Sequence, residues 1–213
     1  MTLIPRRGLL GLGVGAGLSV SGLVRAQDTA PAPEPQPPAA PEPPYVPPTP
    51  VRPPPAGPRR LVFRHLHTLE DLDVVYWADG YYLGEPIAQI QHLLRDFRTE
   101  EEHPINTQLL DLLCTLRAAT GTKEPFRIIS AYRSPETNEM LRDQSAANNP
   151  DGPQVAKKSQ HMEGRAIDLR LIDVSLTGLH KTALDLKGGG VGIYPDSDFI
   201  HVDVGPVRAW QGS

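Results

Sequence analysis

The chain has 213 residues, a formal net charge of −4 at pH 7 and one cysteine. This length suits one ordinary domain with additional segments, since domains most often contain about 100–150 residues. The acidic balance argues against nucleic acid as a partner, which would call for a basic face. The single cysteine excludes an intramolecular disulfide, and the leucines around Cys114 predict a small core residue.

Residues 1–26 have the features of an export signal. The pair Arg6-Arg7 is followed by a glycine-rich apolar run over residues 8–24, and Ala26 ends a small-residue cleavage site. The arginine pair predicts the twin-arginine route, with a partial match to its motif, and therefore a periplasmic protein. The alternative is an uncleaved membrane anchor, and this would be the chain's only membrane contact. The run is short beside the roughly 20 apolar residues of a spanning helix.

Residues 27–58 form a proline-rich segment that holds 15 of the chain's 24 prolines. Such a composition cannot bury enough apolar surface to offset the entropy of ordering, so the segment is predicted to be a disordered, extended linker. A proline-rich recognition ligand is the alternative. Loss of residues 1–26 would remove three arginines and shift the net charge from −4 to −7.

The globular domain is predicted to span residues 59–213 and to begin with strands. Apolar and polar residues alternate over residues 61–84, and Asp79-Gly80 is a strong turn signal, so this region is predicted to be a small antiparallel hairpin. His65 and His67 would share one strand face. We expect both to be surface histidines, with a metal-binding pair as the alternative.

Two core helices are predicted next, one after Pro86 and one after Pro104, with Gly121 just beyond the second. His92 and His103 are expected to face water. A short buried strand over residues 126–131 then leads to a helix that begins around Ser134-Pro135 and ends near residue 145. Residues 146–158 have the turn chemistry of a loop.

The last third of the domain combines two ligand-bearing strands with a helix between them. Alternation over residues 165–171 and 199–204 places aliphatic side chains on one face of each strand and polar side chains on the other. A helix around residues 176–184 ends before Gly188, and a strand follows over residues 191–194. This order predicts an α+β fold with helices packed on one face of a small antiparallel sheet.

Two histidines and a carboxylate stand out as candidate metal ligands. His161 follows the predicted loop, Asp168 lies on the polar face of one strand, and His201 lies on the polar face of the other. Three such ligands that leave a fourth position for water are the usual protein contribution to a catalytic zinc site. The sequence therefore predicts one zinc ion and a hydrolase. Asp203, two residues after His201, is a candidate for support of a zinc-bound histidine.

Asp198 and Arg133 are the candidate catalytic residues. Asp198 precedes His201 by three residues and is expected to accept the proton of the attacking water, a role worth about 100- to 10,000-fold in rate. Arg133 follows a predicted strand and is expected to stabilise the oxyanion or to bind a substrate carboxylate. The alternatives are that Asp198 is only a turn residue and that Arg133 only pairs with Glu136.

These residues occur in motifs that resemble the zinc D-alanyl-D-alanine peptidases. The motifs are Ser130-Ala131-Tyr132-Arg133-Ser134, then Ser159-x-His161-x-x-Gly164-x-Ala166-x-Asp168, and then Asp198-x-x-His201. Within that group the chain looks most like the murein endopeptidase K branch, and the similarity covers roughly residues 61–210. The resemblance implies the Hedgehog-like α+β fold of that family and peptidoglycan stem peptides as the substrate.

The resemblance also implies roles for individual residues. His161, Asp168 and His201 match the zinc ligands, Arg133 matches the substrate-binding arginine, and Ser159 matches a position that can contact substrate. The base of the family is often a glutamate, and the shorter Asp198 occupies its place here. The leading hypothesis is thus a periplasmic zinc endopeptidase that hydrolyses peptidoglycan cross-links, either D,D or L,D. The alternatives are a D-Ala-D-Ala carboxypeptidase and a non-catalytic peptidoglycan-binding module.

Overall fold

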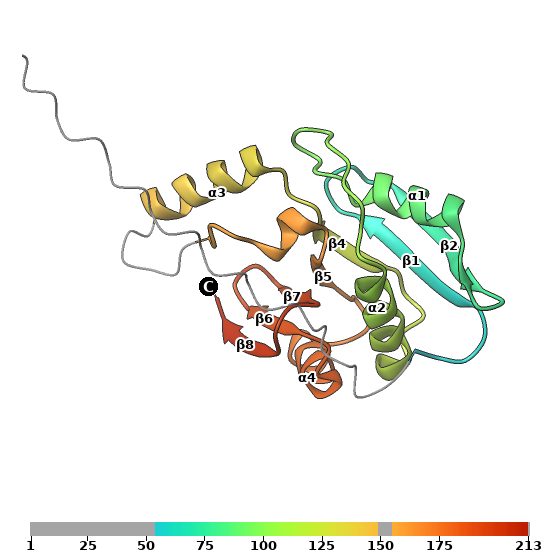
Figure 1. The fold of residues 1–213 in the computed structure, drawn as a ribbon. Helices are drawn as coiled ribbons and strands as arrows, with labels where there is room; N and C mark the ends of the chain where they lie inside the picture. Colours follow the sequence, from blue (N-terminus) through green and yellow to red (C-terminus); the bar gives the residue numbers. More distant parts are fainter. Residues whose placement is uncertain (1–53, 149–154, 213) are drawn as a thin grey trace, which may run out of the picture. The chain divides into compact units, whose positions relative to one another are not determined.

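The computed structural model describes residues 54–148 and 155–212 (Figure 1). The predicted export signal and nearly all of the predicted linker lie outside the described residues. The first strand begins at Arg59, where the globular domain was expected to begin. None of the described helices is long and apolar enough to cross a membrane.

An eight-stranded mixed sheet organises the domain, in the order β3-β2-β1-β4-β5-β7-β6-β8. The strands are β1 (Arg59–His65), β2 (Asp71–Ala78), β3 (Tyr81–Tyr82), β4 (Phe126–Ser130), β5 (Ala166–Arg170), β6 (Gly190–Tyr194), β7 (Phe199–Asp203) and β8 (Arg208–Gln211). The hairpin of β1 and β2 is antiparallel, as predicted, and the turn at Asp79-Gly80 leads into β3.

The expectation of a small antiparallel sheet is met only in part, because the sheet has eight strands and two of its strand pairs are parallel. β1 pairs with β4 in parallel, and β6 pairs with β8 in parallel. Two further strands and two helices separate β1 from β4 in the chain, so β4 can return in the same direction as β1. Alternation within one strand reveals its buried face but not its neighbour, which is why the parallel pairs were missed. The α+β class itself is confirmed.

Helices α1 (Gly84–Leu93), α2 (Thr107–Thr120) and α4 (Leu176–Leu186) build the core together with the sheet. α2 packs against both β1 and α4, and Figure 1 shows α2 and α4 side by side. One continuous apolar cluster joins the inner faces of these helices to alternate strand residues such as Phe63, Ile128 and Ile200. Cys114 of α2 belongs to this cluster, as predicted. The alternate residues that point away from the core are free to form a site.

Local sequence signals fix the ends of several helices. Gly121 ends α2 in the left-handed conformation at φ 71°, and Asn106 caps its start by accepting from the amide of Gln108. The Ser134 side chain accepts from the amide of Thr137 at the start of α3 (Pro135–Asn148). A short 3-10 helix, η1 (Gln160–Glu163), was not predicted.

One of the two predicted surface histidines is buried. His65 ends β1 with no exposed surface, and its Nδ1 accepts from the amides of His67 and Thr68 at 3.2 Å each. His67 is exposed and stacks on Phe97, with ring centroids 4.1 Å apart. The shared strand face failed as an argument because β1 ends at His65 and the chain turns before His67.

Candidate metal centre

The candidate ligands are carried by three different elements. His161 lies on η1, Asp168 on β5 and His201 on β7. β5 and β7 are antiparallel neighbours in which Asp168 and His201 are direct partners, so their side chains project from the same face of the sheet. The alternation in the sequence thus places these two correctly, and η1 brings His161 over the same point.

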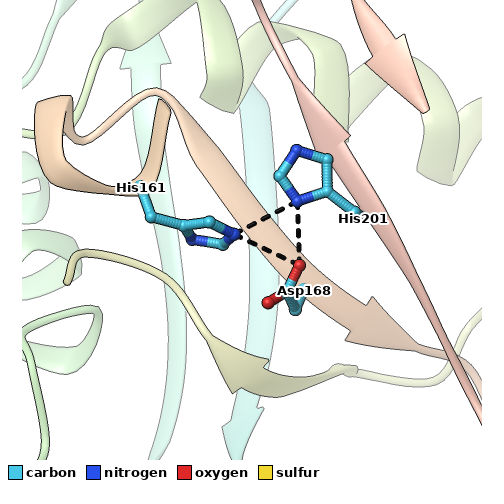
Figure 2. Close-up of side chains that lie close together, drawn as sticks. All are labelled: His161, Asp168 and His201. Atoms are coloured by element: carbon cyan, nitrogen blue, oxygen red, sulfur yellow. Dashed lines mark hydrogen bonds and ion pairs between the residues drawn. The ribbon is translucent and has the colours of Figure 1, made fainter. Parts of the chain in front are cut away.

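The three side chains converge on one another (Figure 2). His161 Nε2 lies 3.1 Å from His201 Nδ1 and 3.3 Å from Asp168 Oδ1, and His201 Nδ1 lies 2.9 Å from Asp168 Oδ1. Zinc bonds of about 2.0–2.1 Å would place tetrahedral ligand atoms about 3.3 Å apart. The spacing of the three donor atoms therefore fits a single zinc ion.

The outer nitrogen of each histidine is held by an acceptor. His161 Nδ1 donates to the carbonyl oxygen of Ala131 at 2.6 Å, and His201 Nε2 donates to Asp203 Oδ2 at 2.9 Å. A carbonyl and an ionised carboxylate can only accept, so each ring carries its proton on the outer nitrogen. The inner nitrogens then present lone pairs to the same point as the Asp168 carboxylate. Three converging acceptors call for a cation between them, which supports a metal at this point.

Burial and charge act on all three candidate ligands. Burial lowers the pKa of His161, whose side chain is almost inaccessible. Burial alone would raise the pKa of Asp168, but His161 and His201 hold it far below its ordinary range. Burial alone would lower the pKa of His201, but the neighbouring carboxylates of Asp168 and Asp203 raise it. Both carboxylates therefore stay ionised and favour positive charge at the centre.

Asp203 is fully buried and lies behind His201, where several hydrogen-bond donors surround its carboxylate. Its Oδ1 accepts from the amides of Gly190 at 3.0 Å and Gly205 at 2.7 Å, and its Oδ2 accepts from Arg208 Nη2 at 2.6 Å. Burial alone would raise the pKa of Asp203, but His201 and the amides of Gly190 and Gly205 lower it. The expected support of His201 by Asp203 agrees with this geometry.

Arg133 lies at the edge of the centre, in the loop between β4 and α3. Its Nη2 is 3.6 Å from Asp168 Oδ2, and its backbone amide donates to the carbonyl oxygen of His161 at 3.2 Å. The buried Nε of Arg133 has no hydrogen-bond partner among the described residues. Arg133 therefore pairs with Asp168 and keeps a donor available.

Two buried groups fix the loop that carries Arg133. Asp96 Oδ2 accepts from both the amide and the hydroxyl of Ser134, at 2.9 and 2.8 Å.

The two ends of η1 are also held in place. At its start, the Ser159 side chain caps η1 by accepting from the amide of His161 at 3.3 Å. Gly164 ends η1 at φ 61°, where a Cβ would lie 2.3 Å from the carbonyl oxygen of Pro104. Backbone contacts thus hold η1 on both sides.

A cavity of about 610 Å³ opens over the three candidate ligands. Its lining includes the predicted Arg133 and Ser159. It also includes residues that sequence analysis did not single out, namely Val155, Ala156, Lys158, Gln160, Tyr194, Phe199, Arg208 and Trp210. Alternation could have indicated Tyr194 and Phe199, since both lie on the polar face of their strands. Arg208 and Trp210 lie on β8, which was not predicted.

Asp198 does not line this cavity. It occupies a turn just before β7 at φ 54°, its side chain is 65% exposed, and its Oδ2 accepts from Arg170 Nη1 at 2.9 Å. The Asp198 carboxylate was expected to lie beside the three candidate ligands, and it does not. The conformation of the turn and the contact with Arg170 direct it away from them. Its role as the general base stays a prediction that rests on its sequence distance from His201 and on the resemblance.

The donor set and the cavity together define a candidate metallohydrolase site. Comparison with known protein families identifies the family. The family model described as peptidoglycan L,D-endopeptidase MepK matches residues 54–210 of this chain. The chain belongs to this family of peptidases.

Curated relatives agree with the family match. The peptidoglycan L,D-endopeptidase MepK of Escherichia coli K12 is 39% identical over 153 residues, which are 72% of this chain and 80% of the relative. The probable peptidoglycan L,D-endopeptidase MepK of Haemophilus influenzae is 37% identical over 156 residues, 73% of this chain and 80% of the relative. No solved structure matches the chain significantly.

Proposed function

We propose that this chain is a zinc-dependent endopeptidase that hydrolyses the L,D peptide cross-links of peptidoglycan in the periplasm. The observation that carries the proposal is the convergence of His161 Nε2, Asp168 Oδ1 and His201 Nδ1 at the floor of an open cavity. The names of the relatives support peptidoglycan as the substrate and an L,D link as the bond.

Zinc bound here would supply a Lewis acid that activates a water molecule for attack on an amide. His161, Asp168 and His201 would be its protein ligands. Ala131 and Asp203 keep the outer ring protons in place, which leaves both inner nitrogens as donors to the metal. The cavity above would admit the substrate.

The remaining site residues would act on the substrate and on protons. Arg133 would donate to a substrate carboxylate or to the oxyanion that develops on the scissile carbonyl. Ser159 would contact substrate from the start of η1. Asp198 would accept the proton of the attacking water and return it to the leaving amine, which requires its carboxylate to leave Arg170.

The N-terminal segments would deliver the enzyme to the wall. Residues 1–26 would act as the export signal, and residues 27–58 would act as an extended spacer between any attachment point and the catalytic domain. The domain would then reach stem peptides at a distance from that point.

The decisive experiment is digestion of cross-linked sacculi by the full chain, with and without added zinc and a chelator. We expect L,D-cross-linked muropeptides to be consumed by the zinc-loaded protein and to persist with the chelator. D,D-cross-linked dimers should remain. Consumption of monomeric pentapeptides alone would favour a carboxypeptidase, and binding without turnover would favour a non-catalytic module.

A matched pair of variants tests the ligand assignment in the same assay. His161→Ala should lose both zinc and turnover. His92→Ala should keep both, because His92 is an exposed residue of α1 that contacts Glu102. Full turnover and zinc content in His161→Ala would contradict the assignment.

A further inference from the structure

A row of four residues crosses the sheet from the candidate metal centre to its edge strand. Asp168 pairs with His201, His201 pairs with Gly192 on β6, and Gly192 pairs with Trp210 on β8. A Cβ at Gly192 would lie 2.5 Å from Trp210 Cε2, so the indole occupies the space that a side chain there would fill. The Trp210 ring reaches within 5.1 Å of the His201 ring, measured between centroids.

The indole of Trp210 fixes the polarity of a tyrosine beside it. Trp210 Nε1 donates to Tyr194 Oη at 2.9 Å. An indole nitrogen can only donate, so the hydroxyl oxygen of Tyr194 is the acceptor and its own hydrogen is directed elsewhere. Among the described residues, 54–148 and 155–212, this hydroxyl donates no hydrogen bond. Tyr194 therefore holds an unused donor at the cavity wall.

The ring of Tyr194 has little freedom to turn that donor away. Phe199 is its cross-strand partner, and the two rings stack with centroids 4.5 Å apart and planes 16° from parallel. Both residues line the cavity that contains Asp168 and His201. Stacking and the hydrogen bond from Trp210 together hold the hydroxyl group in one place.

Burial keeps Tyr194 protonated. It raises the pKa of Tyr194, and the hydrogen bond from Trp210, which lowers this pKa, has a smaller effect; Asp168 raises the pKa and Arg133 lowers it. The influence of Asp168 and Arg133 on this hydroxyl agrees with their common position around one cavity. A neutral phenol is a donor, and a neutral donor can serve an oxygen that becomes negative during the reaction.

We propose that Tyr194 is a further catalytic residue, which donates a hydrogen bond from Oη to the carbonyl oxygen of the amide that is cut. Trp210 is a positioning residue that orients this hydroxyl, and Gly192 gives Trp210 the space to do so. The inference rests on the proposed function, since it assigns a role in amide hydrolysis at the same centre.

The test compares Tyr194→Phe with Tyr82→Phe in the zinc-loaded full chain, with L,D-cross-linked muropeptides as the substrate. Both changes remove one hydroxyl, but the Tyr82 hydroxyl donates to Asp111 and Tyr82 does not line the cavity. We expect kcat of Tyr194→Phe to fall by about 100-fold, as for loss of an oxyanion donor. KM and the zinc Kd, measured by competition with a chelator, should stay within twofold. Tyr82→Phe should match the wild type.

Trp210→Phe provides a second measure. It retains the Tyr194 hydroxyl but removes the group that orients it, so kcat should fall less than in Tyr194→Phe, again without a change in zinc Kd. An unchanged kcat in Tyr194→Phe, a loss confined to KM or a weaker zinc Kd would overturn the assignment and leave the proposed function in place. A zinc-loaded wild type that cuts no substrate would overturn both.

Discussion

His201 Nε2 donates to Asp203 Oδ2 at 2.9 Å, and Asp203 has no exposed surface. This contact fixes which nitrogen of His201 faces the candidate metal. We expect Asp203→Asn to weaken zinc binding by about 10- to 100-fold, the usual effect of removing a group that orients a metal ligand. A chelator competition assay measures this directly.

Asp185→Asn is the control for that measurement. Asp185 is an exposed residue of α4 that pairs with Lys181, so its loss should leave zinc affinity unchanged. Equal zinc affinity in Asp203→Asn and the wild type would show that His201 needs no such support.

Gly192 offers a test of the sheet row that does not remove any polar group. Gly192→Ala would place a methyl group against the Trp210 indole and push it from Tyr194. We expect a lower kcat with unchanged zinc Kd, and a loss of about 1–3 kcal/mol in the free energy of unfolding from overpacking. Gly84→Ala is the control, since a Cβ there meets nothing within 4 Å. Wild-type kcat in Gly192→Ala would contradict the role of the indole.

His65 gives the domain a pH-dependent stability. Burial lowers its pKa from 6.5 to about 4, helped by the charges of His67 and Arg95 and opposed by Glu70. Between these two values the unfolded chain binds more protons at His65 than the folded chain does. The free energy of unfolding should therefore fall as the pH drops from about 6.5 to about 4, by on the order of 2–3 kcal/mol from this group.

Urea unfolding at pH 7.5 and pH 4.5 checks this effect. His65→Asn keeps an acceptor for the turn amides but does not titrate, so its loss of stability between the two pH values should be smaller than that of the wild type. His92→Asn, at an exposed position, should behave like the wild type. The same pH dependence in all three proteins would rule out His65 as the source.

Asp198 can be tested against its neighbour in the same turn. If the carboxylate is the general base, Asp198→Asn keeps zinc and loses about 100- to 10,000-fold in kcat, which is the outcome we expect. Asp196→Asn should retain activity. Full turnover in Asp198→Asn would leave Asp198 as a turn residue paired with Arg170 and would assign the base elsewhere.

Sequence patterns predicted the parts of the site that depend on local periodicity. Alternation placed Asp168 and His201 on the polar faces of their strands, and the register of β5 and β7 brings those faces together. The position of Arg133 directly after a strand was also enough to single it out, because buried hydrogen bonds to Ser134 hold the loop that carries it. Gly121 and Ser134 marked helix ends for reasons that are equally local.

The features that were missed depend on contacts between distant segments. The parallel pairing of β6 and β8 brings Trp210 beside His201, and no sequence pattern within residues 208–211 predicts that pairing. His65 is buried at the end of β1, where its ring contacts Phe97 and its Nδ1 accepts from the amides of the following turn, and alternation alone cannot reveal these contacts. Asp198 was expected near His201 by sequence distance, but its backbone conformation and Arg170 decide where its carboxylate points.

The strand order also separates the chemistry from one edge of the sheet. β2 and β3 contribute no residue to the lining of the cavity over the metal centre, and the Asp79-Gly80 turn joins them. This turn is a suitable place for a fluorescent label or an epitope, because exposed loop tips tolerate insertions best. A protein that carries a label at this turn could be followed in cells while the residues that line the cavity stay unchanged.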